Sequence, residues 1–241
     1  MDTARISALL APFLDHVVPH VRGPQTTRFS PVGAEVSRFL RRGGLLSPLQ
    51  LAQISTYIDL LLRWNQRINL TAVRDPESIV TRHFGESFFL ARHLLPAPCD
   101  RPSLEVVDIG SGAGFPGLPL KIWAPNIQLT LVESNHKKAA FLREVCRALT
   151  LTDVNVIAGR AESLIGHIPP ADLVTFRAVE HFEDILPLAS RFLAPSGRLA
   201  LLIGASQIST LITLTPHLSW LPPIQLPRSE SRVIAISSLL A

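Results

Sequence analysis

Short apolar runs recur through the second half of the chain. Segments whose apolar residues follow a helical period lie between the first of these runs. Leu104–Ile109 is apolar at most positions, which is typical of a strand buried on both faces. The same pattern predicts four further parallel strands, at Gln128–Glu133, Asp153–Ala158, Ala171–Phe176 and Arg198–Gly204. Strands that alternate with helices such as Asn135–Leu149 predict an α/β fold.

The last two apolar runs, Leu218–Leu226 and Arg232–Ser238, fit an antiparallel pair that closes the sheet. Prolines within the first of these runs remove backbone donors and predict an irregular edge strand. We therefore expect a seven-stranded, mostly parallel sheet with helices on both faces.

Two helices are predicted before the first strand. Ser47 is a good N-cap, Pro48 suits the first helical turn, and Gln50 completes a capping box. The apolar residues that then follow at helical spacing are Leu51, Ile54, Ile58, Leu61 and Leu62. The second helix is expected over Ser78–Leu95. Each helix is expected to bury one apolar face, and both lie before the first predicted strand.

These patterns divide the chain into three parts. Residues 1–44 mix Pro, Gly and Arg around one short helical run, Ile6–Val18, and are expected to form a flexible extension. Residues 45–98 hold the two helices and are expected to form a helical cap. Residues 99–241 contain every predicted strand and are expected to form the main domain.

The candidate chemistry lies in the turn after the first strand. Asp108 precedes Gly110, Gly112, Gly114 and Gly117. Glycines let the backbone approach a ligand, and a helix N-terminus offers free N–H groups, so the turn predicts a nucleotide-type cofactor. The last three glycines alone also fit a dinucleotide site. A carboxylate beside the glycines would repel a pyrophosphate, so Asp108 favours S-adenosylmethionine (SAM).

Several motifs together resemble one family. They are Trp64-Asn65, Asn69-Leu70-Thr71, Arg82-His83 with Ser87, and Phe115-Pro116-Gly117. Between Ser47 and Gly204 the chain resembles the bacterial 16S rRNA (guanine-N7) methyltransferases, the RsmG family (GidB, glucose-inhibited division protein B). The resemblance implies a Rossmann-like class I SAM-dependent methyltransferase fold with an N-terminal helical cap. Two positions depart from the family pattern: Glu86 replaces the usual Asp, and Ile203 replaces the usual Lys.

The residues expected to bind SAM follow the predicted strands. Glu133 ends the second strand, where a carboxylate can accept hydrogen bonds from both ribose hydroxyls. The resemblance implies that Ala161 and Glu162, after the third strand, lie against the adenine. The full set expected to contact the cofactor is Asp108, Gly110, Gly112, Gly114, Phe115, Glu133, Ala161, Glu162 and Arg177.

The fourth strand ends in Arg177, without the Asn-Pro-Pro-Tyr or Pro-Cys motifs of methyltransferases that act on amines or ring carbons. Guanine N7 carries a free lone pair, so its methylation needs alignment but no base or nucleophile. We expect Arg177 to orient cofactor and base, and Asn69, Arg82 and His83 to shape the acceptor side. A lone helical histidine is more often a hydrogen-bonded structural residue than a base, so both roles stay open for His83.

Composition limits the remaining possibilities. Cys99 and Cys146 offer no disulfide framework and no metal-ligand spacing, so we expect a cytoplasmic protein without a metal. No window is apolar enough for a membrane span. The net charge is +4, and the whole excess lies in residues 1–103. This charge is compatible with a phosphate-rich partner, for which we expect 16S rRNA within the small ribosomal subunit, bound by a monomer.

Two other functions fit part of the sequence. A small-molecule methyltransferase would share Leu104–Gly204 but would have no use for Trp64-Asn65 or Asn69-Leu70-Thr71. A non-catalytic SAM-binding or RNA-binding module would accommodate Ile203, although most of the expected cofactor residues are present.

Overall fold

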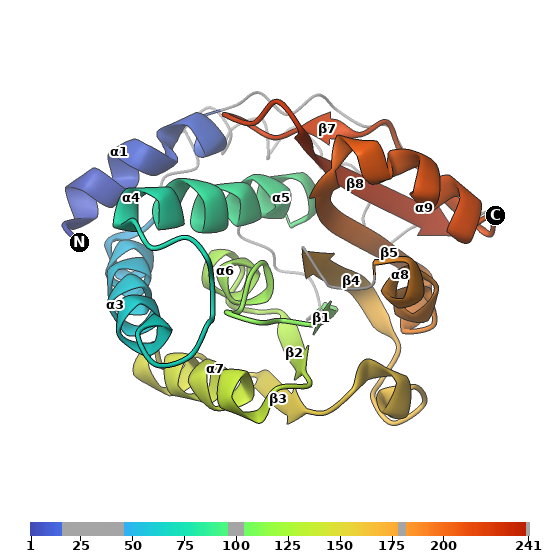
Figure 1. Cartoon of the computed structure of the whole chain (residues 1–241), viewed down its shortest axis with the longest axis horizontal. Helices are drawn as coiled ribbons and strands as arrows, with labels where there is room; N and C mark the ends of the chain where they lie inside the picture. Colours follow the sequence, from blue (N-terminus) through green and yellow to red (C-terminus); the bar gives the residue numbers. More distant parts are fainter. Residues whose placement is uncertain (16–45, 96–103, 178–181, 240–241) are drawn as a thin grey trace.

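A computed structural model of the chain describes residues 1–15, 46–95, 104–177 and 182–239. Figure 1 shows a central sheet with helices on both of its faces. The strands pair in the order β3-β2-β1-β4-β5-β8-β6, and β7 pairs with β8. The sheet is parallel from β3 to β5, whereas β8 runs antiparallel to β5. The expected α/β architecture is therefore confirmed. Cys99 lies outside the described residues.

The strands agree closely with the apolar runs. They are β1 (Glu105–Ile109), β2 (Gln128–Glu133), β3 (Val154–Ala158), β4 (Ala171–Arg177), β5 (Leu193–Gly204), β6 (Leu218–Trp220), β7 (Ile224–Gln225) and β8 (Arg232–Leu239). The predicted strand Leu218–Leu226 is in fact two short strands, so the described residues form a sheet of eight strands instead of seven. Pro222 and Pro223 separate them because a proline has no N–H to donate to β8.

Two helical layers cover the sheet. One face carries α1 (Thr3–Leu14), α3 (Pro48–Asn65), α4 (Pro76–Ile79), the π-helical turn η1 (Val80–Gly85), α5 (Glu86–Leu94), α6 (Gly117–Trp123) and α7 (His136–Ala148). The other face carries α8 (Phe182–Ser190) and α9 (Ile208–Leu214), with the 3₁₀ turns η2 (Ala161–Leu164) and η3 (Ala205–Gln207). The predicted helix Ser78–Leu95 is thus interrupted by a π turn, which often marks a functional position.

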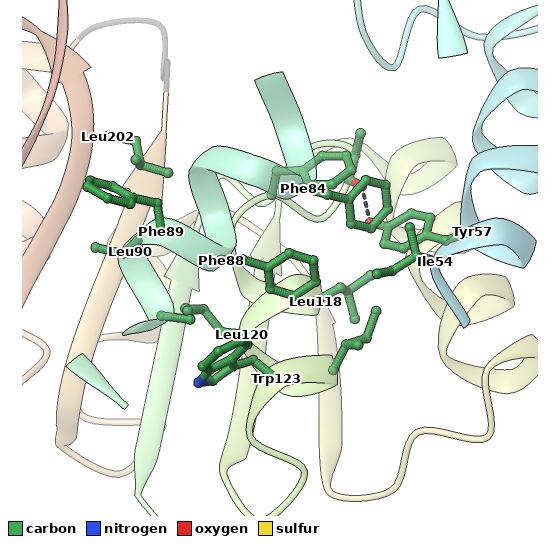
Figure 2. Packing of buried hydrophobic residues seen from close by; sticks show 14 of the residues in the cluster. Ile54, Tyr57, Phe84, Phe88, Phe89, Leu90, Leu118, Leu120, Trp123 and Leu202 are labelled. Atoms are coloured by element: carbon green, nitrogen blue, oxygen red, sulfur yellow. Dashed lines mark hydrogen bonds between the residues drawn. The ribbon is translucent and has the colours of Figure 1, made fainter. Parts of the chain in front are cut away.

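The cap helices pack directly onto the sheet domain. The capping box of Ser47 and Gln50 starts α3 as predicted, and the Gln50 amide also donates to the Ile122 carbonyl of α6 at 2.8 Å. Figure 2 shows Phe88 of α5 among the apolar side chains of α6. Its ring lies 6.1 Å from that of Trp123, whose indole N–H donates to the Leu95 carbonyl. The cap and the sheet therefore share one apolar core.

Helix α1 belongs to the same core. Its buried side chains include Ile6, Leu10 and Phe13. A Cβ on Gly85 would lie 2.7 Å from the Phe13 ring, so the close approach of α1 to η1 requires a glycine there. The helix begins earlier than the predicted Ile6–Val18, and residues 16–18 lie outside the described part. Among the described residues, no helix is both long and apolar enough to cross a bilayer.

Candidate functional site

The glycine turn joins β1 to α6 at the carboxyl edge of the sheet. Gly110, Gly112 and Gly114 all have positive φ angles, of 64°, 56° and 89°, which only glycine adopts readily. A Cβ on Gly112 would meet nothing closer than a backbone oxygen at 3.7 Å, so the space beside this residue is open. A Cβ on Gly114 would clash with Tyr57 and Leu118. The turn is therefore packed at Gly114 and open at Gly112, where a ligand can approach its backbone.

Asp108 lies under this turn and has no exposed surface. Its carboxylate accepts a hydrogen bond from the Thr175 hydroxyl of β4 at 2.9 Å and a longer one from the Gly117 N–H. Burial raises the pKa of Asp108 to about 7, in spite of these hydrogen bonds, which lower it. In this geometry Asp108 joins β1, β4 and α6, and it holds the turn from beneath.

Glu133 ends β2 beside the glycine turn and is almost buried. One carboxylate oxygen accepts from the Gly112 N–H and the other from the Asn135 N–H, both at 2.8 Å. A carboxylate offers about four lone-pair positions, so two remain for other donors. The sequence places Glu133 at this edge because the apolar run of β2 ends there.

Tyr57 of α3 fixes the packed side of the turn. Its hydroxyl donates to the Ala113 carbonyl at 2.5 Å, and its ring stacks on Phe115 at 5.4 Å between centroids. Phe115 also lies edge-on to Phe84 of η1 at 5.1 Å. Tyr57 is fully buried, so the cap holds the backbone of the glycine turn through both a hydrogen bond and aromatic contacts.

The loop after α3 is organised by Asn65, which belongs to the Trp64-Asn65 motif but had no predicted role of its own. The side-chain oxygen Oδ1 of Asn65 accepts hydrogen bonds from the N–H groups of Leu70 and Thr71. The side-chain amide of Asn65 donates to the Thr71 carbonyl, and all three distances are within 3.0 Å. Asn69, which was predicted to shape the acceptor side, is exposed on this loop. The Asn-Leu-Thr motif therefore forms a tight loop around the end of α3.

His83 lies between this loop and the glycine turn. The Thr71 hydroxyl and the His83 Nε2 are 2.8 Å apart, and the imidazole lies against Phe115 with 4.8 Å between ring centroids. Burial and the positive charges of Arg177 and Arg82 together lower the pKa of His83 to about 3. His83 is therefore a neutral, hydrogen-bonded residue, and it is held too far from its usual pKa to act as a base near neutral pH.

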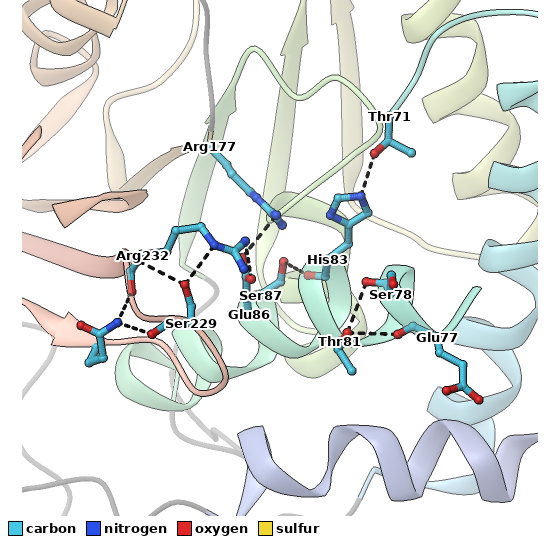
Figure 3. A network of polar contacts seen from close by, with 11 residues as sticks. Thr71, Glu77, Ser78, Thr81, His83, Glu86, Ser87, Arg177, Ser229 and Arg232 are labelled. Carbon is cyan, nitrogen blue, oxygen red and sulfur yellow. Dashed lines mark hydrogen bonds and ion pairs between the residues drawn. The ribbon is translucent and has the colours of Figure 1, made fainter. Parts of the chain in front are cut away.

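A charged network connects the cap to the end of β4 (Figure 3). Glu86 of α5 is buried, and its carboxylate pairs with Arg177 at 3.3 Å and with Arg232 at the start of β8. The Arg232 Nε also donates to the Ser229 hydroxyl at 3.2 Å. Burial raises the pKa of Glu86, although both arginines act in the opposite direction. The network places the Arg177 guanidinium beside the cap.

The structure brings most of the predicted site residues to one edge of the sheet. Near the glycine turn lie Glu133, Phe115, His83 and, on the neighbouring strand β4, Arg177. Ala161 is buried and Glu162 is exposed in η2, which follows β3. Arg82 is exposed on η1. Ile203 of β5 is buried in the apolar layer under α8 and α9.

Four residues of the site carried no predicted role. They are Tyr57, Asn65, Glu86 and Arg232. A lone tyrosine at an apolar helical position and a glutamate within a predicted helix are ordinary in sequence, so only their tertiary partners reveal their roles. Asn65 had a signal, because it precedes the Asn-Leu-Thr motif and an asparagine readily bonds to a nearby loop.

A separate cavity of about 360 Å³ lies between the start of α8 and the segment η3–α9. It is lined by Phe182, Glu183, Asp184, Gln207 and Thr210, none of which belongs to the glycine turn. Among the described residues, no cluster of three or more His, Cys, Asp or Glu side chains could hold a metal ion.

Sequence comparison gives a consistent result. The model of the GidB family, described as rRNA small subunit methyltransferase G, matches residues 50–219. The ribosomal RNA small subunit methyltransferase G of Chloroflexus aggregans is 40% identical over 206 residues, which cover 81% of this chain and 84% of that protein. The protein of the same description from Xylella fastidiosa is 38% identical over 185 residues, covering 76% of this chain and 84% of its own length.

Solved structures resemble the fold at low sequence identity. P. horikoshii TYW2 in complex with MeSAdo aligns with a TM-score of 0.51 at 14% identity, covering 66% of this chain and 63% of that one. An Agrobacterium tumefaciens protein described as a predicted O-methyltransferase aligns with a TM-score of 0.51 at 19% identity, covering 65% and 81%. These similarities concern the fold alone.

Proposed function

The chain belongs to the rRNA small subunit methyltransferase G family, and from this premise we propose that it transfers a methyl group from SAM to N7 of a guanine in 16S rRNA. Its relatives bear the name of a ribosomal RNA methyltransferase over more than two thirds of this chain. The observation that carries the proposal is the meeting of the glycine turn, Glu133 and Arg177 at one edge of the sheet.

The residues at this edge fit SAM. The open backbone at Gly112 and the free lone pairs of Glu133 suit an adenosine ribose, as the doubly wound folds use them. The Arg177 Nη1 is buried and has no hydrogen-bond partner among the described residues, so it is ready for an acceptor. Gly110, Phe115, Ala161 and Glu162 would complete the pocket, while Asp108 would hold the glycine turn in shape.

The residues on the acceptor side are consistent with methylation of an atom that does not have to lose a proton first. SAM, when bound, supplies a methyl group on a positively charged sulfonium. His83 is neutral and its Nε2 is engaged with Thr71, so it is unsuited to remove a proton. Guanine N7 presents an in-plane lone pair, and its methylation requires only proximity and alignment. Arg177 would orient the base or the cofactor, and the exposed Asn69 and Arg82 would contact the RNA.

The proposed substrate form is the assembled small ribosomal subunit. The surplus of basic residues lies in residues 1–103, of which the cap, residues 45–98, holds five basic and four acidic residues. Arg82 and Asn69 are exposed on the cap beside the buried His83. Exposed polar side chains such as these, next to the methyl-transfer site, suit a phosphate-rich surface better than a small metabolite.

Methyl transfer from labelled SAM tests this proposal. The protein would be incubated with unmethylated 30S subunits, with naked 16S rRNA, and with a small-metabolite extract. We expect label in 16S rRNA, with 30S subunits the preferred substrate. Label that enters only small metabolites would overturn the proposal in favour of a small-molecule methyltransferase. SAM binding without transfer to any substrate would indicate a non-catalytic module.

A further inference from the structure

The Nδ1 atom of His83 is buried and has no hydrogen-bond partner within the described part of the chain. The residue as a whole is only 8% exposed. The large majority of buried side-chain polar atoms in folded proteins are paired, so an unpaired one at a candidate site indicates a partner that arrives with a ligand. The centroid of the His83 ring lies 4.8 Å from that of Phe115, which follows Gly114 in the glycine turn. The unpaired nitrogen is therefore on a ring that borders the cofactor turn.

The contacts of Thr71 determine where the neutral His83 ring carries its proton. The Thr71 hydroxyl oxygen accepts a hydrogen bond from the Val73 N–H at 3.1 Å, which leaves the hydroxyl proton to be donated. The His83 Nε2 lies 2.8 Å from that oxygen and is the acceptor within reach among the described residues. Since a neutral imidazole has one acceptor nitrogen and one N–H, the proton is then on Nδ1. The unpaired Nδ1 is therefore a donor, and Figure 3 shows it pointing away from Thr71.

A buried neutral donor beside the cofactor turn suits the oxygen atom next to guanine N7. On that edge a guanine presents two acceptors, N7 and O6, whereas an adenine presents N7 and an amino group that donates. A donor that meets O6 therefore holds the adjacent N7 in place, and it would face another donor if the base were adenine. We propose that the Nδ1–H of His83 donates a hydrogen bond to O6 of the target guanine and so selects guanine over adenine. This inference rests on the proposed function, because it takes guanine N7 as the methyl acceptor.

The neutral state of His83 matches the charge that develops on the base. During transfer the N7 lone pair bonds to the methyl carbon, and the carbon–sulfur bond breaks with its electrons left on the sulfur. The base then carries the positive charge, and no proton has moved. A cationic donor at O6 would repel this charge, whereas a neutral N–H does not. Burial and the positive charges of Arg177 and Arg82 lower the pKa of His83 to about 3 and so keep the donor neutral.

Methyl transfer to a base that lacks O6 tests the inference. Mass spectrometry would first locate the methylated guanine, and 30S subunits would then be reconstituted with 2-aminopurine at that position. This base keeps N7 and the 2-amino group but has a hydrogen atom in place of O6. For the wild-type protein kcat/KM should be about tenfold to hundredfold lower on this substrate, because the buried Nδ1–H would be left unpaired. In His83→Leu this ratio of the two kcat/KM values should fall toward one.

His83→Asn should keep part of the ratio, because its side-chain N–H lies close to the position of Nδ1. The exposed Arg147→Gln is the control and should keep the wild-type ratio. Each ratio compares two substrates on one protein, so a smaller folded fraction cancels.

A wild-type ratio in His83→Leu would overturn the inference. If that variant also bound SAM more weakly in a calorimetric titration without RNA, the donor would serve the cofactor instead. A wild-type protein that methylated no guanine of 16S rRNA would overturn the proposed function itself, which distinguishes the two failures.

Discussion

At the scale of single residues, the site depends on side chains whose importance only the fold reveals. Tyr57 stands at an apolar position of a helix, and nothing near it in sequence indicates a hydrogen bond to the glycine turn. In the structure its hydroxyl holds the Ala113 carbonyl and its ring supports Phe115. The position of Glu133, by contrast, was predictable, because the apolar run of β2 ends at the carboxyl edge of the sheet.

Tyr57→Phe should retain the stacking and lose the hydrogen bond. The Ala113 carbonyl would then be left without its buried donor, so the free energy of unfolding should fall by about 1–2 kcal/mol. The SAM dissociation constant should rise several-fold, because the turn would be less well ordered. Urea unfolding and calorimetry measure the two effects. The exposed Thr56→Ala should change neither, and equal effects of both variants would contradict the assigned role of Tyr57.

The stability should depend on pH through His83. Its pKa is about 3 in the fold against 6.5 for an ordinary histidine, so below pH 6.5 the unfolded chain binds a proton that the folded chain does not. This contribution to stability is fully present above pH 6.5 and is lost as the pH falls toward 3. Residue 83 cannot titrate in the variant His83→Asn. The excess of the wild-type unfolding free energy over that of the variant should therefore shrink as the pH falls from 6.5 toward 3.

The unfolding free energy of the variant has to be subtracted from that of the wild type, because Asp108 makes stability depend on pH in the opposite direction. Its pKa is raised to about 7 in the fold, so its contribution is lost as the pH rises toward 7. Since Asp108 is present in both proteins, its effect cancels in the difference. A difference that stayed constant from pH 6.5 downward would show that His83 is not buried in its neutral form.

At the scale of elements, the cap presents its residues through two irregular segments. The loop after α3 is closed by Asn65, and the π turn η1 interrupts the helical run so that His83 faces Phe115. The capping box, the glycine turn and the strand ends were predictable from local patterns. The π turn was not, because helical periodicity in the sequence does not distinguish a single wider turn from a regular one.

Asn65→Ala should loosen the loop after α3. The N–H groups of Leu70 and Thr71 would lose their acceptor, so the free energy of unfolding should fall by about 1–3 kcal/mol. Hydrogen exchange at these two amides should become faster. Asn69→Ala is the matched variant, since its exposed side chain should affect methyl transfer and leave amide exchange as in the wild type. Equal amide exchange in both variants would contradict this account of the loop.

Glu86→Gln tests the link between the cap and the sheet. Two arginines would lose their common carboxylate in a largely buried position, so we expect a loss of about 2 kcal/mol in unfolding free energy. Glu77→Gln is the control, because it removes the partner of Arg5 in an exposed pair and should change stability little. Urea unfolding measures both, and a similar small effect in the two variants would exclude a structural role for the network.

At the scale of the whole molecule, the strand order brings together residues that lie far apart in the chain. The apolar runs identified the parallel strands of the described residues, and in β1 and β4 this is because a strand buried on both faces must be largely apolar. The pairing of Glu86 with Arg177 and Arg232 could not be predicted, because it depends on where the start of α5 lies relative to the end of β4 and the start of β8. The division into extension, cap and main domain stays a prediction, although α1 packs into the common core.

The central claim is that the methyl group reaches guanine N7 in 16S rRNA. The most direct measurement is nucleoside mass spectrometry of 16S rRNA from 30S subunits incubated with the protein and isotopically labelled SAM. We expect a single labelled nucleoside, 7-methylguanosine, and its absence when Arg177→Gln replaces the wild-type protein. Label on an exocyclic amine, on a ring carbon or on no nucleoside of the rRNA would contradict the account.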